Sequence, residues 1–358
     1  MKLLADLKVP VLYVNPPLNA DSGLIEKVSR SGGLGIVDHV TSGPSTFKVS
    51  PGIAHGVRVL VQDIERFSSE PGVAAALIAL EDVDSLSSLD SGALSRLSIP
   101  VMVEVASADQ AVVAANAGAS AVVARGNEGP GWVSETNGMV LLQEILRKTD
   151  IPVYLQGGID FRTAAGALAA GASGVVLDVH LLLTSESGLD SALQTFLRTL
   201  SMPATSLLAE IIGSPLRVYS RVGTKIVREL KRLEDSLTPD DFATYRERLD
   251  SALKAPVSAP DSGGGLLPLS EDIVTAKKFA EQFGSAEAVL KEFDKRLFQI
   301  FLDWPFTGES AICKGHGTEF PIVQGPMAHV SDNPDFLAAV AAGGALPFMA
   351  MGNMPEPI

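Results

Sequence analysis

The stretch that most constrains the fold is Ile151–His180, IPVYLQGGIDFRTAAGALAAGASGVVLDVH. An apolar run ends in the pair Gly157 and Gly158, an alanine-rich segment of helical character follows, and a second apolar run occupies residues 174–179. Strand, glycine turn, helix and strand in this order form the unit from which parallel sheets are built. A glycine pair between a strand and a helix lets backbone N–H groups point at an anion, although it also serves as a plain tight turn.

Short apolar runs of this kind recur along the first 200 residues, with helical or turn segments between them. The sequence predicts eight strands, at 9–14, 34–38, 57–61, 74–80, 100–105 and 119–124 and at the two runs of the stretch 151–180. The runs are largely apolar rather than alternating, as expected for strands that are covered on both faces. Eight such units within about 170 residues favour a closed (β/α)8 TIM barrel over a doubly wound open sheet.

Helices are predicted between several of these strands. One follows a cap at Asp21 and Ser22, one spans residues 83–97, and one begins at the capping residue Ser107. The composition of the sequence changes after residue 200. Residues 203–255 are highly charged and are predicted to be helical, without strands.

The end of the chain repeats its beginning. The sequence from Phe320 aligns without a gap with the sequence from Val9, so that Pro321 falls on Pro10 at an offset of 311 residues. One strand–helix–strand unit cannot bury both of its faces alone, so the chain is expected to be a fragment of a longer polypeptide. The predicted domains are a barrel at 1–200, a helical lobe at 201–300 with a flexible linker near 256–268, and the truncated start of a second barrel at 320–358.

Composition excludes several classes of protein. The net charge of −14 argues against binding to nucleic acid or to an anionic membrane surface. No run reaches the ~18 apolar residues of a membrane helix, and the N-terminus has no signal-peptide pattern. The single cysteine, Cys313, excludes an internal disulfide and suits a reducing, cytoplasmic location. The histidines lack metal-ligand spacing, so no metal site is predicted.

Residues 320–352 resemble the N-terminal signature of the nitronate monooxygenase (2-nitropropane dioxygenase-like) flavoenzymes, a P-I-x-Q-x-P-M strand followed by a helix and a GG turn. The matching residues are PIVQGPMAHVSD. The first barrel resembles the same family more loosely, through GASAVVARGNEGPGWVSE and QGGIDFRTAAGALAAGASGVVLD. The first of these blocks, together with the tandem arrangement, is most similar to the copies found in large polyketide-synthase-like proteins. The resemblance implies a TIM barrel that binds FMN.

The resemblance also implies which residues would contact FMN. Arg58 stands where the family has an asparagine that faces the flavin, and Arg125 stands where it has a glutamine. After the last barrel strand the family offers a Gly–Thr backbone pair, where this chain has Leu177 and Asp178. The cofactor-binding residues implied in this way are Asn15, Pro16, Arg58, Arg125, Gly126, Gly157, Gly158 and Asp178.

The position of the family's catalytic histidine is taken by Trp132. An indole cannot accept a proton at neutral pH, so base chemistry on a nitronate is not supported there. The remaining catalytic candidates are Glu104 and Glu128, and either would act as a base only if burial raised its pKa. Trp132 itself has two interpretations, an aromatic group that stacks on flavin or substrate and a plug that fills a vacated pocket.

The charged residues at the barrel mouth leave two interpretations open. Arg58 and Arg125 could neutralise a phosphate beside Asp178, or they could form with Glu104 and Asp178 a buried salt-bridge network that has replaced the cofactor. The first predicts an FMN-dependent oxidoreductase domain of a polyketide- or fatty-acid-synthase-like protein, with a small organic or acyl-thioester substrate and the other domains of that protein as partners. The second predicts a cofactor-free barrel that serves as a structural or docking module.

Overall fold

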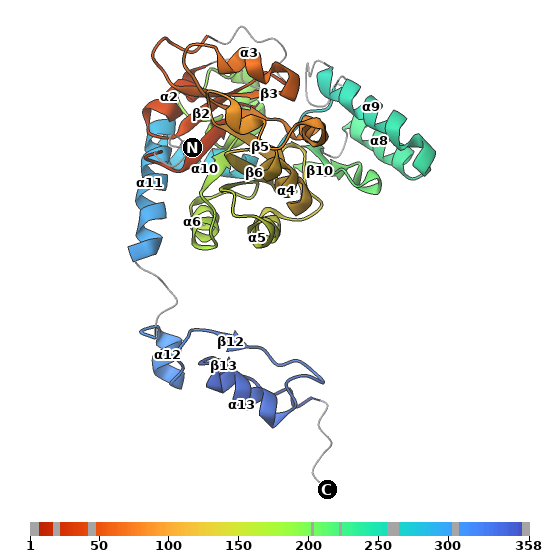
Figure 1. Cartoon of the computed structure of the whole chain (residues 1–358). Helices are drawn as coiled ribbons and strands as arrows, with labels where there is room; N and C mark the ends of the chain where they lie inside the picture. Colours follow the sequence, from red (N-terminus) through yellow and green to blue (C-terminus); the bar gives the residue numbers. More distant parts are fainter. Residues whose placement is uncertain are drawn as a thin grey trace. The chain divides into compact units, whose positions relative to one another are not determined.

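The computed structural model describes residues 7–16, 22–41, 48–201, 204–221, 224–255, 265–302 and 308–352 (Figure 1). The chain divides into two compact units, Met1–Leu297 and Phe298–Ile358. The predicted cap at Asp21 and most of the predicted linker lie outside the described residues. None of the helices within these ranges combines the length and the apolar composition that crossing a membrane requires.

Eight parallel strands of the described chain close into a barrel, so the TIM-barrel prediction is confirmed. In order around the barrel they are β1 (Val11–Val14), β2 (Leu34–Asp38), β3 (His55–Val59), β4 (Val73–Ile78), β5 (Val101–Val105), β6 (Ala121–Arg125), β8 (Val153–Gln156) and β9 (Gly174–Leu177). The sheet closes where β9 pairs with β1 and Leu12 lies opposite Val176. Each predicted apolar run overlaps one of these strands.

The barrel interior is a packed apolar core rather than a pore, as is usual for this fold. The inward-facing side chains that form one buried cluster are Leu12, Val14, Leu34, Ile36, Ala75, Leu77, Met102, Ala121, Val123, Tyr154 and Val176. These residues come from alternate positions along the strands, because successive side chains of a strand point to opposite faces. Asp38, Arg58, Glu104, Arg125 and Gln156 lie in the last two positions of their strands.

Helices pack around the barrel strands (Figure 1). They are α2 (Gly23–Arg30), α3 (Ile64–Ser68), α4 (Ala108–Asn116), α5 (Gly138–Lys148) and α6 (Phe161–Ala169). Helix α7 (Ser191–Arg198) follows the last barrel strand. Ser107 caps α4 as predicted, because its side chain accepts a hydrogen bond from the Gln110 N–H. Helix α2 approaches β2 so closely that a Cβ on Gly35 would lie 2.4 Å from the Ile25 carbonyl oxygen, and only glycine fits there.

The helix predicted at residues 83–97 is wrong. Two short 3₁₀ segments occupy this region, η2 (Leu80–Ser88) and η3 (Leu94–Arg96). The stretch is rich in serine and aspartate, whose side chains compete with the helix for backbone partners. The Ser88 hydroxyl, for example, donates to the Ser85 carbonyl oxygen.

The prediction that residues 203–255 contain no strands is also wrong. Two short strands, β10 (Thr205–Leu208) and β11 (Leu216–Tyr219), form an antiparallel sheet with β7 (Gly131–Trp132), which leaves the barrel between β6 and β8. The remaining elements of this region are η5 (Glu210–Ile212), α8 (Lys225–Glu234), η6 (Pro239–Asp241) and α9 (Phe242–Lys254). The small sheet fixes the position of Trp132, because Leu216 pairs with it directly.

The chain returns to the barrel after this lobe. Helix α10 (Ile273–Phe283) packs on η4 (Val179–Leu181), and α11 (Ala286–Leu302) follows it. Phe161 at the start of α6 stacks on Phe279 of α10 with ring centroids 4.7 Å apart. The ring centroid of Phe293 of α11 lies 4.6 Å from that of Phe161. Residues up to Leu297 are thus part of the barrel's packing.

The second unit contains the strand–helix–strand order that the repeat predicts. Its elements are α12 (Ala311–His316), β12 (Val323–Gln324), α13 (Pro334–Ala342) and β13 (Leu346–Pro347), and β12 pairs with β13 in parallel. The ungapped alignment, at an offset of 311, places Val323 on Leu12 and is wrong by one residue only after the helix, because Leu12 pairs with Leu34 whereas Val323 pairs with Leu346. The Gly33 N–H donates to the Val28 carbonyl oxygen, and the equivalent bond joins Ala345 to Val340, an offset of 345 − 33 = 312. Helix α13 has nine residues where α2 has eight.

Candidate functional site

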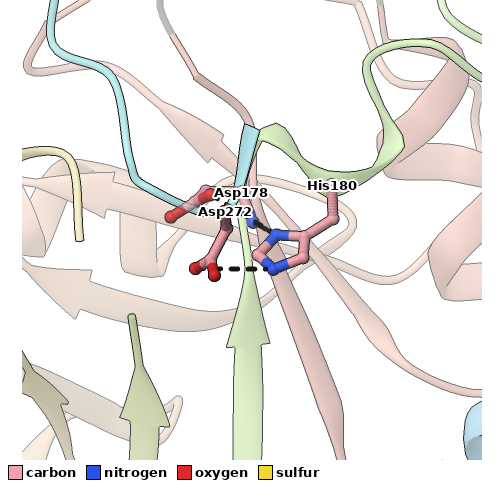
Figure 2. A group of neighbouring side chains, drawn as sticks. All are labelled: Asp178, His180 and Asp272. Carbon is pink, nitrogen blue, oxygen red and sulfur yellow. Dashed lines mark hydrogen bonds and ion pairs between the residues drawn. The ribbon is translucent and has the colours of Figure 1, made fainter. Parts of the chain in front are cut away.

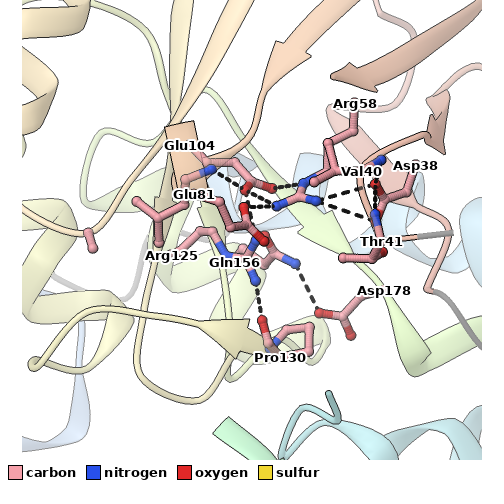
Figure 3. A network of polar contacts seen from close by, with 12 residues as sticks. Asp38, Val40, Thr41, Arg58, Glu81, Glu104, Arg125, Pro130, Gln156 and Asp178 are labelled. Atoms are coloured by element: carbon pink, nitrogen blue, oxygen red, sulfur yellow. Dashed lines mark hydrogen bonds and ion pairs between the residues drawn. The ribbon is translucent and has the colours of Figure 1, made fainter. Parts of the chain in front are cut away.

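A buried ion network occupies the carboxyl ends of β3, β5 and β6 (Figure 3). Glu104 is fully buried, and its two carboxylate oxygens accept hydrogen bonds from Arg58 at 3.0 and 2.8 Å and from Arg125 at 2.8 Å. The Leu80 N–H donates to the same carboxylate at 2.9 Å. Glu104 is therefore the bridge between the two guanidinium groups.

Arg58 has further carboxylate partners. Its guanidinium contacts Asp38 at 3.3 Å and Glu81, and the side chain is almost fully buried (Figure 3). Burial by itself opposes the charged form, but Glu104, Glu81 and Asp38 together raise the pKa of Arg58 well above its ordinary value. Arg58 is thus a permanent cation whose charge is already neutralised by the protein.

The electrostatics do not support Glu104 as a base. Burial alone would raise its pKa, but Arg125 and Arg58 outweigh burial and lower the pKa of Glu104 to about 2. The sequence-based hypothesis required the opposite shift. Glu128, the other candidate, accepts a hydrogen bond from the Gly138 N–H at 3.0 Å and so anchors the start of α5.

Asp178 belongs to a second cluster beside the ion network. Its carboxylate accepts a hydrogen bond from the Gln156 side chain at 3.1 Å (Figure 3). It also accepts from the Ser270 hydroxyl at 3.2 Å and from the Val179 N–H. The predicted four-residue network of Arg58, Arg125, Glu104 and Asp178 is therefore correct for its first three members only.

The glycine turn adopts the backbone conformation that its sequence predicts. Gly157 and Gly158 have φ angles of +101° and +70°, in the region that favours glycine. The Gly158 N–H donates to a carboxylate oxygen of Asp272 at 3.0 Å. The sequence does not predict the role of Asp272, because nothing in its local pattern marks it as a partner of a turn 114 residues away.

Asp178, His180 and Asp272 form a buried triad (Figure 2). The Asp178 N–H donates to His180 Nδ1 at 3.2 Å, and His180 Nε2 lies 2.9 Å from the Ile159 carbonyl oxygen and 3.5 Å from the Asp272 carboxylate. Three such groups within 4.8 Å of one another could in principle bind a metal ion. Because both ring nitrogens already have backbone partners, we assign the triad a structural role.

Burial raises the pKa of Asp272 to about 7, and the neighbouring carboxylates of Asp178 and Glu128 act in the same direction, against the lowering effect of His180. The pKa of His180 is raised as well, because Asp272 and Asp178 outweigh the effect of burial. Burial and the neighbouring carboxylates thus act against the charged form of Asp272, whereas Asp272 and Asp178 favour the charged form of His180.

Trp132 fills space at the mouth. Its side chain is 3% exposed, and the guanidinium carbon of Arg246 lies 3.5 Å from the ring centroid. This cation–π contact covers the indole from the side of α9. Of the two interpretations of Trp132, this arrangement favours a side chain that fills a vacated pocket.

The remaining predicted residues divide between two places. Asn15 is fully buried and accepts a hydrogen bond from the Tyr13 hydroxyl at 3.2 Å. One cavity of about 50 Å³ has in its lining the predicted residues Asn15, Pro16, Arg58, Arg125, Trp132 and Asp178. Gly126, Glu128, Gly157 and Gly158 instead lie together at the neighbouring turn, where the Gly126 N–H donates to the Gln156 carbonyl oxygen.

Three polar atoms around this cavity lack a hydrogen-bond partner among the described residues. They are Arg125 Nε, Trp132 Nε1 and Gln156 Oε1, and all are buried. Buried polar groups are normally satisfied, so each such exception needs an explanation. Two donors and one acceptor around one cavity are what a small polar group would bind.

A closed parallel barrel with its polar groups at the carboxyl ends of the strands defines a TIM-barrel protein whose site lies at that face. A sequence model of the family described as nitronate monooxygenase matches residues 46–267, more than half of the chain. The chain belongs to the nitronate monooxygenase family, whose members are FMN-dependent oxidoreductases. The family match therefore confirms three predictions: the family, FMN as the cofactor of that family, and the class of flavin-dependent oxidoreductases.

Two curated relatives carry the name (3aS,4S,5R,7aS)-5-hydroxy-7a-methyl-1-oxo-octahydro-1H-indene-4-carboxyl-CoA dehydrogenase. The protein from Rhodococcus jostii is 32% identical over 139 residues, which are 38% of this chain and 38% of the relative. The protein from Mycobacterium tuberculosis is 27% identical over 244 residues, which are 64% of this chain and 67% of the relative. The match thus spans well under half of the first relative and about two thirds of the second.

Solved structures support the fold. FabK from Thermotoga maritima has a TM-score of 0.63 and 21% identity, over 85% of this chain and 97% of that one. A nitroalkane oxidase from Streptomyces ansochromogenes has a TM-score of 0.56 and 20% identity, over 84% of this chain and 99% of that one. At this level of identity the two structures establish the shared fold alone.

The site as arranged does not fit the phosphate of FMN. The backbone donors that would bind it already have internal acceptors: Gly158 donates to Asp272, Val179 to Asp178, and the first N–H groups of α6 to Asp160. A dianionic phosphate about 4 Å from one more carboxylate would meet repulsion on the order of 4 kcal/mol per charge pair at an effective dielectric constant of about 20. The mouth cavity is also small beside the roughly 300 Å³ of a typical ligand site.

Proposed function

We propose that this chain is an oxidoreductase domain that acts on an acyl thioester rather than on a nitronate. The observation that carries the proposal is Trp132, a buried indole at the position of the family's catalytic base. Neither Glu104 nor Glu128 replaces that base, since both carboxylates are held in structural hydrogen bonds. The curated relatives named as dehydrogenases of a carboxyl-CoA compound support the thioester class.

A second cavity supports the same substrate class. Its volume is about 330 Å³, within the size range of small-molecule sites, and Trp132 lies in its wall. Hydroxyl and carboxylate groups line it, among them Ser107, Ser134, Thr136, Glu81, Asp84, Glu135 and Glu144, together with the guanidinium of Arg246, which lies over the Trp132 ring. Such a wall suits neutral polar groups, for example the amides of a pantetheine arm, better than it suits phosphates, which the carboxylates would repel.

The test is a comparison of substrate classes on the full chain with added FMN, in one series with reduced pyridine nucleotide as hydride donor and in another with oxidised pyridine nucleotide as hydride acceptor. Enoyl and saturated thioesters of CoA and of N-acetylcysteamine are compared with propyl-2-nitronate, and products are identified by mass spectrometry. We expect oxidation or reduction of a thioester and background oxygen consumption with the nitronate. Turnover of the nitronate with no change in any thioester would contradict the proposal.

A second candidate function is a cofactor-free module that positions other domains. The observation that favours it is the internal satisfaction of the phosphate-binding N–H groups, together with the ion network around Glu104. The discriminating measurement is flavin absorbance after the protein is incubated with excess FMN and gel-filtered. Retention of stoichiometric FMN rules this candidate out.

We also propose that residues 320–358 begin a second barrel of the same family, within a synthase-like polypeptide. The parallel pair β12–β13 and the helix α13 between them support this, as does the recurrence of the Gly33–Val28 bond at Ala345–Val340. Several large apolar side chains of this unit are exposed, including Ile322, Val323, Phe348 and Met351. Further strands of a barrel would cover them. Fusion to the missing strands of a family barrel should therefore raise the protection of α13 amides from exchange.

A further inference from the structure

The segment Ser270–Asp272, here named the plug segment, is tied to the site at several points. The Ser270 hydroxyl donates to Asp178 at 3.2 Å, and its oxygen accepts a hydrogen bond from the Asp272 N–H at 3.1 Å. The Glu271 N–H donates to the Glu128 carbonyl oxygen at 2.9 Å, and the Glu271 carboxylate pairs with Arg217 at 2.8 Å. The plug segment thus lies against both the glycine turn and the end of β9.

Asp272 has an unusual partner for its position. It is the N-cap residue of α10, where an aspartate normally accepts a hydrogen bond from an N–H of its own helix. Its side chain makes no such capping bond. One carboxylate oxygen instead accepts the Gly158 N–H and lies near His180 (Figure 2). The carboxylate is therefore directed to the turn and not to its helix.

We propose that Asp272 is an internal anion ligand of the Gly157–Gly158 turn and competes with the flavin phosphate for it. FMN then binds this barrel only when the plug segment leaves the turn. The inference rests on the proposed function, because it takes FMN as the group that the turn would receive. A carboxylate on the same chain is present at a high effective concentration, so free FMN must displace a tethered competitor.

The carboxylate of Asp160 provides a control. It distinguishes the effect of a carboxylate that binds the Gly158 N–H from the effect of a negative charge near the turn. Asp160 follows the same turn, is exposed, and caps α6 by accepting from the N–H groups of Arg162 and Thr163. Its side chain is also a carboxylate, but it is not the acceptor of the Gly158 N–H. Asparagine is an equally good N-cap, so Asp160→Asn removes that charge and keeps the cap.

The experiment measures FMN affinity of the full chain by equilibrium dialysis for the wild type, Asp272→Ala and Asp160→Asn. We expect Asp272→Ala to bind FMN at least ten-fold more tightly than the wild type, and Asp160→Asn to stay within about three-fold of it. Asp272→Ser, which keeps a capping residue on α10, serves if the alanine variant does not fold. Circular dichroism and thermal unfolding verify each variant.

The outcomes distinguish the inference from the proposed function. Equal FMN affinity in the wild type and Asp272→Ala overturns the inference and leaves the flavin-dependent function intact. An equal gain in FMN affinity in Asp272→Ala and Asp160→Asn also overturns it. The affinity would then depend on the negative charge near the turn and not on a side chain that binds the Gly158 N–H. Failure of every variant to bind FMN overturns both.

Amide exchange supplies a readout that needs no ligand. If Asp272 holds the Gly158 N–H, exchange at Gly158 should be at least ten-fold faster in Asp272→Ala than in the wild type and unchanged in Asp160→Asn. An exchange rate at Gly158 that is the same in all three proteins would show that the contact is not maintained in solution, and the inference would fail.

Discussion

Replacement of Glu104 by glutamine tests whether the ion network stabilises the barrel. The carboxylate is fully buried and bridges Arg58 and Arg125, so its loss leaves Arg125 without an acidic partner in the described network. Removal of one partner of a buried charge pair costs about 3–5 kcal/mol. The pKa gives a similar magnitude, because a shift from 4.5 to about 2 corresponds to about 3 kcal/mol.

The pH dependence has a definite sign. The pKa of Glu104 is lower in the folded protein than in the unfolded chain, so its contribution is complete above about pH 4.5 and is lost as the pH falls toward 2. The free energies of unfolding of the wild type and Glu104→Gln, measured in urea, should therefore differ by about 3 kcal/mol at pH 7 and by less than half of that at pH 3.

Glu81→Gln is the matched control, because Glu81 also contacts Arg58 but its side chain is 24% exposed. Its loss should cost about 1 kcal/mol or less. If Glu104→Gln costs no more than Glu81→Gln, or if its cost does not change between pH 7 and pH 3, the reasoning from the buried bridge is refuted.

Three further predictions address packing and chemistry. Gly35→Ala should lower the free energy of unfolding by about 2 kcal/mol or more, since its Cβ would lie 2.4 Å from the Ile25 carbonyl oxygen; a change within 0.5 kcal/mol, measured by urea unfolding, would contradict the close approach. The wild type with FMN should not consume oxygen with propyl-2-nitronate, and activity gained by Trp132→His would locate the missing base. Arg246→Ala should shift the fluorescence of Trp132 to longer wavelength and cost about 1 kcal/mol; an unchanged spectrum would argue against the stacking.

The barrel was predictable because its strands are largely apolar runs and recur at regular intervals. Leu34–Asp38 and Gly174–Leu177 are buried at every position, and such runs are seldom anything but strands of a parallel sheet. The strands β10 and β11 were missed because each has four residues within a charged segment. Strand β11 also pairs with β7, which lies some 80 residues earlier, and such pairing leaves no local signal.

The candidate site was predictable only in part. Arg58, Arg125 and Trp132 stand at strand ends or family positions that the sequence identifies, and the structure brings them around one cavity. What holds each charge could not be predicted, because Asp38 and Glu81 reach Arg58 from other strands and loops. The occupant of the glycine turn was equally hidden, since Asp272 lies in a segment whose composition indicates only a helix start.

The position of Asp272 also matters for how this domain is dissected. The family match ends at residue 267, five residues before the side chain that binds Gly158. A fragment cut at that boundary would lose Asp272 and also Phe279, which stacks on Phe161. Such a fragment would expose an apolar face and offer a free N–H to any anion in the buffer. An anion affinity measured on such a fragment would reflect the loss of Asp272 and not the property of the native chain. A shortened version should therefore extend at least through Leu297.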